Sequence, residues 1–313
     1  MLFRSGDKLI YFFNKSAKHN AIINGKVNYI YGGGLAKKTP SAISFVDQKD
    51  DAGNTISKAL SVNSDGESFN EVIEKSIRDT RIFAGFRWFI VWNAKGGISD
   101  IKHVEFNKIR TGKDGHCFYY KQDWLNNKEE AQEFEEFNAN NRKGTQIFAY
   151  NEYRPGTKYY PLPDYMGCLN YIETDIEISK YYLSAITNGM LPSKLIQFFD
   201  GTPTEEQKRE IENRWKKKFS GAENGGKFIL VFNQNKDKSI EINDLSATES
   251  DKLFDQLNKT CQQEIFTGHQ IVSPMLFGIK TEGQLGGNME LTTAYQIFTN
   301  TYANPKREPI EKI

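Results

Sequence analysis

The sequence has few cysteines and histidines. Among 313 residues there are three cysteines, Cys117, Cys168 and Cys261, which are odd in number, far apart and outside any CxxC spacing. This set argues against a disulfide framework and a structural zinc site, and it favours a reducing compartment. We expect neither a metal nor a cofactor in this chain.

Long apolar runs and a leader sequence are also missing. No stretch approaches the roughly 20 apolar residues that span a bilayer, and residues 1–7 show no basic segment leading into an apolar one. We therefore expect a soluble protein made inside the cell, with no membrane partner. A Walker A motif is absent as well, so we do not expect ATP hydrolysis.

An excess of either charge is missing too. Lysine plus arginine (41) almost equals aspartate plus glutamate (40), which leaves a net charge of +1 at pH 7. Such a chain has no global field that attracts nucleic acid, so any DNA contact has to be local or imposed by shape. Aromatic residues, by contrast, make up 13% of the chain. Large aromatic surfaces suit subunit interfaces as well as ordinary cores.

The first 160 residues have the pattern of a mixed α+β body. Apolar spacing predicts a helix over 7–31, which breaks near Ser16 and ends at the glycines 32–34, and a second helix over 68–83. Apolar alternation predicts four strands, the first two joined by a glycine turn. These strands cover residues 86–92, 98–106, 116–121 and 146–150. We interpret the acidic stretch 129–136 as a solvated helix.

The remaining sequence is organised around two long amphipathic helices. From Asp164, a plausible N-cap, apolar residues recur at spacings of four and three, and an Asn-Gly-x-x-Pro pattern at 188–192 closes the helix. A capping box at 246–249 begins the second helix, which ends at Gly268. We expect the two helices to be antiparallel partners.

A compact insert lies between these helices. Strands predicted over 194–199 and 227–232 flank a helix that begins at residues 202–205 with a threonine N-cap, a proline at the first helical position and a glutamate. Strand, helix and strand indicate a small βαβ unit that needs neighbours to cover its other faces. After the second long helix, a polar glycine-rich loop over 279–288 leads into a helix over 289–302.

Several residue groups suggest catalysis or ligand binding without completing a site. The glycines 32–34 precede Lys37 and Lys38, but they follow a helix, so we interpret them as a helix end rather than a phosphate loop. Glu177 and Lys180 are placed as an ordinary surface pair rather than part of a nuclease site. His116 and Cys117 are neighbours on a strand and face opposite sides. We interpret the other histidines, His19, His103 and His269, as isolated.

Taken in order, these motifs resemble the siphophage-type portal proteins of tailed bacteriophages. The resemblance rests on the Asn-Gly-x-x-Pro pattern at 188–192, on Gly-Ala-Glu-Asn-Gly-Gly-Lys at 221–227 and on Val-x-Pro-x-Leu-x-Gly at 272–278. Residues 19–34 also resemble the first helix of such proteins. The matching motifs cover about half of the chain.

The resemblance implies a portal-like α+β architecture. Its expected parts are a wing body (1–160), a first stem helix (161–190), a βαβ clip (191–244), a second stem helix (245–271), and a tunnel loop and helix (272–313). The family normally continues into more wing and a helical crown. This chain stops at Ile313, so we expect the crown to be missing.

The resemblance also implies a function without catalytic residues. Copies of the chain would form a ring, most often a dodecamer, whose channel at one capsid vertex passes double-stranded DNA without sequence specificity during packaging and ejection. The implied partners are the large terminase, the major capsid protein and a head–tail adaptor, and the implied location is the virion, with host cytoplasm during assembly. The tunnel-loop residues are Lys280, Glu282, Gly283, Gln284, Gly286 and Gly287. The candidate clip contacts are Trp215, Lys216, Lys217 and Phe219.

Two other hypotheses stay open. A hydrolase or metal-dependent nuclease would have its site in the sheet of residues 86–160. A scaffold protein without a channel would form monomers or dimers. Rings without metal-dependent DNA cleavage would favour the portal hypothesis over both.

Overall fold

The computed structural model describes residues 6–32, 34, 45–49, 55–59, 61–188, 192–198, 204–219, 227–232, 241–244, 248–279 and 288–313. The chain divides into two compact units, one formed by Met1–Leu169 with Ile265–Ile313 and the other by Asn170–Glu264. Helices accompany sheets with both parallel and antiparallel pairs, so the chain is an α+β protein, as the sequence predicts.

Two consecutive helices begin the first unit. Helix α1 (Gly6–Lys15) and helix α2 (Ala17–Tyr31) are separated at Ser16, whose side chain accepts a hydrogen bond from the His19 amide and caps α2. Gly32 ends α2 with a φ of 55°, a conformation that glycine adopts without steric cost. The predicted break at Ser16 and the predicted glycine end are both confirmed.

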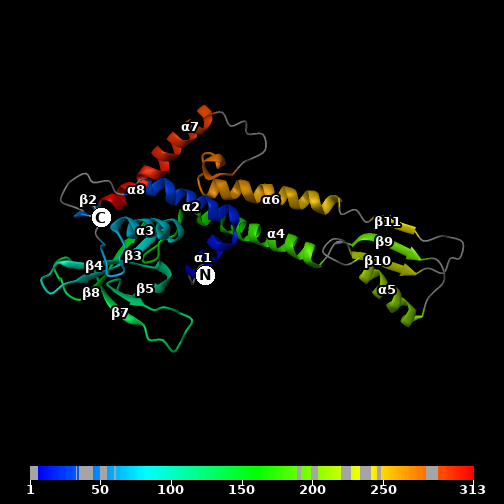
Figure 1. The fold of residues 1–313 in the computed structure, drawn as a ribbon, viewed down its shortest axis with the longest axis horizontal. Helices are drawn as coiled ribbons and strands as arrows, with labels where there is room; N and C mark the ends of the chain where they lie inside the picture. Colours follow the sequence, from blue (N-terminus) through cyan, green and yellow to red (C-terminus); the bar gives the residue numbers. More distant parts are fainter. Residues whose placement is uncertain are drawn as a thin grey trace. The chain divides into compact units, whose positions relative to one another are not determined.

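Helix α3 (Phe69–Phe83) covers one face of the main sheet. Ser68 and Glu71 form a reciprocal capping box at its start, which satisfies two amide groups that the first turn leaves free. The helix buries Val72, Ile73 and Ile77, as the apolar spacing predicts. Figure 1 shows α3 beside β3 and β4, which it contacts.

The main sheet has six strands in the order β4-β3-β8-β7-β6-β5. They are β3 (Gly85–Trp92), β4 (Ile98–Val104), β5 (Ile109–Thr111), β6 (Cys117–Tyr120), β7 (Gln132–Glu136) and β8 (Thr145–Asn151). Apart from the parallel β7–β8 pair, these neighbours are antiparallel. Trp88 donates from Nε1 to Ser76 Oγ of α3 at 2.7 Å, which joins helix and sheet through a buried hydrogen bond. A separate hairpin pairs β1 (Phe45–Lys49) with β2 (Thr55–Ala59).

The acidic stretch contains a strand, so the helix predicted over 129–136 is wrong. Strand β7 pairs with β6, placing Phe134 opposite Phe118, and the Phe134 ring lies 4.9 Å from that of Phe89. Phe134 alternates with Glu133 and Glu135, which are exposed. The packing of Phe134 against neighbouring strands fixes the register of β7. The acidic composition alone had suggested a solvated helix.

The C-terminal part of the first unit is helical. A 3-10 turn (Pro274–Phe277) precedes helix α7 (Asn288–Phe298), which passes through a π-helical turn (Thr299–Ala303) into helix α8 (Asn304–Glu311). The helix predicted over 289–302 therefore exists and extends further. A π turn inserts an extra residue into an α-helix and so changes which side chains face the core after it.

The second unit contains the insert and most of both long helices. Helix α4 (Leu169–Asn188) leads to β9 (Pro192–Phe198), α5 (Glu205–Phe219), β10 (Lys227–Phe232), β11 (Glu241–Asp244) and α6 (Thr248–Gly268). Strands β9 and β10 are parallel, so the predicted βαβ connection is confirmed. Strand β11 adds an antiparallel neighbour to β9 that the sequence analysis missed. Figure 1 shows β9 between β10 and β11, in keeping with this pairing.

Two predicted helix starts are wrong in detail. Pro163, not Asp164, precedes the 3-10 turn Asp164–Cys168 that leads into α4. Helix α5 begins two residues later than its motif suggested, because Thr204 and Gln207 form the reciprocal cap: Thr204 Oγ1 accepts from the Gln207 amide at 3.4 Å, and Gln207 Oε1 accepts from the Thr204 amide at 3.0 Å. Residues 202–205 (Thr-x-x-Glu) and residues 204–207 (Thr-x-x-Gln) both match the capping-box pattern, so the sequence alone does not choose between them. The expected cap at Thr202 and that at Ser246 lie outside the described residues.

The apolar stripe of α4 is buried in the first half of the helix. Leu169, Ile172 and Ile176 are buried, whereas Leu183 is 66% exposed. Within the ranges given above, none of the helices combines the length and the apolar character that crossing a bilayer requires.

Candidate functional site

The side chains of the predicted site residues lie outside what the structure describes, but the segments that flank the predicted tunnel loop are described. The tunnel-loop residues Lys280, Glu282, Gly283, Gln284, Gly286 and Gly287 lie outside the described residues. The predicted clip contacts Trp215, Lys216, Lys217 and Phe219 belong to α5, for which the backbone is described at these positions. The segments on either side of the predicted loop are described, and both belong to the first unit.

An aromatic cluster of Tyr29, Phe277 and Phe298 holds these two segments against α2. The Tyr29 hydroxyl donates to the Leu276 carbonyl at 2.9 Å, and its ring lies 5.9 Å from Phe277 and 5.3 Å from Phe298. Phe277 and Phe298 meet edge to face at 5.4 Å. Because Phe277 precedes the predicted loop and Phe298 belongs to the helix after it, the cluster fixes both sides of the segment 280–287.

A glycine on α2 makes this packing possible. A Cβ atom at Gly25 would lie 2.4 Å from the Phe277 ring, closer than real Cβ contacts. The absence of a side chain at Gly25 therefore lets Phe277 rest on the helix. Each favourable aromatic pair adds about 0.5–1.5 kcal/mol beyond the burial of apolar area. The predicted loop thus connects two firmly packed ends.

Helix α7, which follows the predicted loop, carries little charge. Glu290 is the one charged residue among its eleven, although charged residues make up 26% of the chain. Met289 is 86% exposed, and Tyr295 and Ile297 are also exposed. Since α7 lacks lysine and arginine, it offers no side-chain cation to a phosphate backbone.

A cluster of buried charges lies where α7 continues into α8. The π turn places the Tyr302 hydroxyl 3.0 Å from Arg81 Nη1, which donates to it, and 2.6 Å from Asp164 Oδ2, which accepts its proton. Lys26 Nζ lies 3.5 Å from Asp164 Oδ2 and 4.2 Å from the centre of the Tyr302 ring. These contacts join α2, α3, the start of the 3-10 turn before α4 and the C-terminal helices.

Glu152 completes this charge cluster. It pairs with Arg81, and Lys306 Nζ of α8 donates to its Oε2 at 2.7 Å. Two carboxylates therefore face three cations in one connected network. Removing one member of such a network leaves a buried ion without its partner, which costs more than the intact pair contributes.

The charge cluster is built to stay ionised. Burial alone raises the pKa of Asp164, but Lys26 and Arg81 outweigh it and bring the pKa down to about 2. Burial lowers the pKa of Lys26 to about 8 even though Asp164 opposes that shift. Burial also raises the pKa of Tyr302 well above its usual value, so its hydroxyl keeps its proton. Lys26, Arg81 and Tyr302 are at most 5% exposed, so a substrate cannot reach them. The cluster is a structural clamp.

Two histidines meet beside this cluster, so the interpretation of His19 and His269 as isolated is wrong. Their nitrogens Nδ1 and Nε2 lie 2.8 Å apart, and the Tyr165 ring stacks on His269 at 4.9 Å. Burial lowers the pKa of His19 to about 3 and that of His269 well below 6.5. Both rings are therefore neutral at pH 7, and one donates a hydrogen bond to the other.

The structure also describes the other residue groups that the sequence singled out, namely His103 and the pair of Glu177 and Lys180. His103 is not isolated either, because its Nε2 lies 2.9 Å from Asp79 Oδ2. Glu177 and Lys180 form the expected surface pair at 2.7 Å. In the part of the chain that the structure describes, no group of three or more His, Cys, Asp or Glu side chains is arranged to hold a metal ion.

Comparisons with known proteins place the fold. No protein-family model matches the chain, and no curated protein matches it. Among solved structures, a chain in the neck of a native GTA particle, computed with C12 symmetry, aligns at a TM-score of 0.57 and 16% identity, over 92% of this chain and 74% of that chain. A chain in the virion of a native gene transfer agent particle aligns at 0.56 and 15% identity, over 93% and 76%.

A phage protein is found by the same comparison. An HK97 family phage portal protein from Corynebacterium diphtheriae aligns at a TM-score of 0.44 and 10% identity, over 91% of this chain and 84% of that chain. The two particle chains have scores above 0.5, and the shared fold rests on them. The portal resemblance stated from the sequence is thus confirmed at the level of the fold.

Proposed function

We propose that this chain is a portal-like subunit, identical copies of which close into a ring at the neck of a phage-like particle. The observation that carries this proposal is the fold shared, over 92% of the chain, with a protein in a particle neck computed with C12 symmetry. A closed ring needs two different complementary surfaces on each copy. We assign part of that contact to the clip residues Trp215, Lys216, Lys217 and Phe219.

The channel of this ring would be lined by residues 280–287. Phe277 and Phe298 hold both sides of this segment on α2, so the loop can follow a passing duplex without moving the body that carries it. Lys280, Glu282 and Gln284 of every copy would then surround the duplex and contact its backbone without reading sequence. A net charge of +1 and an α7 without cations favour sliding over retention.

The parts named from the sequence keep their proposed roles. Residues 1–160 form the wing, 161–190 and 245–271 the stem helices, 191–244 the clip, and 272–313 the tunnel loop and helix. The ring would dock the large terminase, then a head–tail adaptor, and sit in the major capsid protein shell. Because the chain carries no Walker A motif, the energy of DNA translocation would come from the terminase.

Sedimentation velocity tests this proposal together with a nuclease assay. A dodecamer has twelve times the 35.9 kDa mass of the chain, about 431 kDa. We expect a large discrete species and no cleavage of plasmid DNA with Mg²⁺ or Mn²⁺. A monodisperse monomer that cleaves DNA in a metal-dependent way would replace the proposal with the nuclease hypothesis. An inactive monomer or dimer would favour the scaffold hypothesis.

A further inference from the structure

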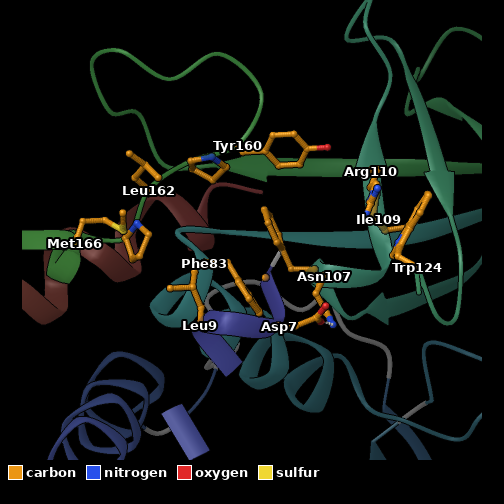
Figure 2. A pocket seen from close by; sticks show the side chains of 14 residues that line it. Asp7, Leu9, Phe83, Asn107, Ile109, Arg110, Trp124, Tyr160, Leu162 and Met166 are labelled. Carbon is orange, nitrogen blue, oxygen red and sulfur yellow. Dashed lines mark hydrogen bonds between the residues drawn. The ribbon is translucent and has the colours of Figure 1, made fainter. Parts of the chain in front are cut away.

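A cleft in the first unit has the size and lining of a ligand site. Its volume is about 430 Å³, and it lies between the start of α1, the end of α3, residues 106–110, Trp124 and the segment 160–166 (Figure 2). Leu9, Phe83 and Ile109 line it and are at most 7% exposed. Ligand sites are usually apolar clefts of about 300–1,000 Å³ with a few well-placed polar groups.

One of these polar groups is a buried acceptor without a partner. Asn107 lines the cleft, and its Nδ2 donates to Asp7 Oδ1 at 2.8 Å, which fixes the orientation of the amide. Its Oδ1 is buried and receives no hydrogen bond. Buried acceptors are nearly always satisfied in folded proteins. Asn107 Oδ1 is thus a polar atom in the wall of the cleft that is too covered for a ligand in the cleft to reach.

A second polar group is an unpaired cation. The Arg110 guanidinium lies 4.0 Å from the centre of the Trp124 ring, and both residues line the cleft. Trp124 is held in turn by a hydrogen bond from its Nε1 to the Lys108 carbonyl at 3.0 Å. Within the described residues Arg110 makes no ion pair with a carboxylate. A stacked guanidinium in a fixed position suits a carboxylate on a ligand.

The apolar surface continues beyond the cleft. Leu125, which follows the lining residue Trp124 in the sequence, is 85% exposed, and Tyr160, which itself lines the cleft, is 48% exposed. The loop that presents Leu125 is firmly built, because the Glu129 carboxylate accepts from the amides of Gln122 and Asp123 at 2.8 and 3.1 Å. Leu125 and Tyr160 add exposed apolar area around the lining residue Trp124, and a larger continuous apolar area favours a protein partner.

We propose that this cleft binds an extended segment of a partner protein. An apolar side chain of the segment enters the cleft between Leu9 and Ile109, and an acidic residue of the segment pairs with Arg110. The apolar lining favours a peptide over a DNA duplex, because a duplex keeps its bases stacked inside and presents phosphates. The cleft belongs to one unit of one chain, so this proposal does not depend on ring formation.

Selection of peptides tests the site. We would select a random heptapeptide library on the full-length wild-type chain and measure the binding of the recovered peptides by fluorescence anisotropy. The expected peptides share an aliphatic or aromatic residue with an aspartate or glutamate nearby. They should bind Arg110→Gln at least tenfold more weakly than wild type, and Leu162→Trp, which places a larger side chain in the cleft wall, should bind weakly as well.

The matched control is Arg142→Gln. Arg142 is a second exposed arginine near a tryptophan, 5.8 Å from the Trp92 ring, and does not line the cleft, so this variant should bind as wild type does. Equal melting temperatures would show that the variants are folded. The proposal fails if no shared peptide pattern emerges, if binding does not depend on Arg110, or if an oligothymidylate displaces the peptides and itself requires Arg110.

Discussion

The hydroxyl of Tyr302 joins two buried ions of opposite charge. It accepts from Arg81 and donates to Asp164, and it reaches both because a π turn brings residue 302 to this place. The ring also lies over Lys26, so one side chain contacts three members of the charge cluster. The attachment of the C-terminal helices to α2 and α3 depends on this residue.

Replacement of Tyr302 by phenylalanine tests that dependence. Tyr302→Phe keeps the ring but removes one partner each from Arg81 and Asp164. Leaving buried polar groups unsatisfied should lower the free energy of unfolding by about 1–3 kcal/mol. Urea titration followed by circular dichroism measures the loss. Tyr295→Phe, an equal change at a tyrosine that is 47% exposed, is the control and should be near neutral. Equal losses in both variants would contradict the role of the hydroxyl.

The histidine pair predicts how stability changes with pH. In the unfolded chain His19 and His269 take up protons near pH 6.5, whereas in the folded chain the pKa of His19 is about 3 and that of His269 is well below 6.5. The unfolded state therefore binds more protons below pH 6.5, and stability falls as the pH falls. Each histidine contributes a slope that approaches about 1.4 kcal/mol per pH unit between pH 6 and 5.

A histidine substitution isolates this effect. His269→Gln can keep the hydrogen bond to His19 but removes one titrating group, so the loss of stability between pH 7 and 5 should be smaller than in wild type. His116→Gln is the comparison. Glu136 raises the pKa of the exposed His116, so protonation of His116 at low pH stabilises the folded state. Its removal should therefore not reduce the loss of stability between pH 7 and 5. An unchanged pH dependence in His269→Gln would show that the buried pair does not control it.

Residues that act through local sequence were predictable, and those that act across the chain were not. The Ser16 cap follows from its place between two apolar-periodic segments. The contact between His19 and His269 joins residues 250 positions apart, and no local pattern signals it. Asp164 was predicted as a helix cap from its place after a proline, but tertiary neighbours assign its carboxylate to Tyr302 and Lys26.

At the level of elements, periodic helices and hairpins were predictable, and strands defined by their partners were not. Helix α3 has apolar residues at helical spacing behind a capping box, and the β3–β4 hairpin is marked by an aromatic-rich run followed by a glycine turn at Gly96 and Gly97. Strands β7 and β11 are short and mainly polar, and each exists because a neighbouring strand offers unpaired backbone groups. Sequence periodicity does not record such a partner.

A deletion in the predicted tunnel loop tests its proposed function without disturbing the fold. Deleting residues 283–287 should leave assembly and melting temperature close to those of wild type, because Tyr29, Phe277 and Phe298 hold the flanking segments. DNA retention should fall in a packaging assay in which the variant is supplied to particles that lack the wild-type gene for this chain. The control Tyr29→Ala keeps the loop but removes the contacts of Tyr29 with Phe277 and Phe298, and it should lower the melting temperature.

This deletion can also go against the proposal. If the deletion variant no longer associates, residues 283–287 are an assembly element and the channel role assigned to them is wrong. If it associates and retains DNA as well as wild type does, the loop does not contact the duplex. The melting temperature separates both results from simple misfolding.

At the level of the whole molecule, the sequence order of the elements carried the resemblance, and the fold shared with chains of a particle neck and of a virion agrees with it. Each sequence motif alone is short and common. The fold comparison aligns 92% of this chain at 16% identity, so it does not depend on any single motif. Subunit contacts could not be derived in this way, because they depend on surfaces that meet only when copies assemble.

Negative-stain electron microscopy of the purified full-length chain tests the central claim most directly. The account predicts class averages of an annulus with a central hole and rotational symmetry, formed without any other protein. Compact particles without a hole, of the size expected for one or two copies of the chain, would contradict it.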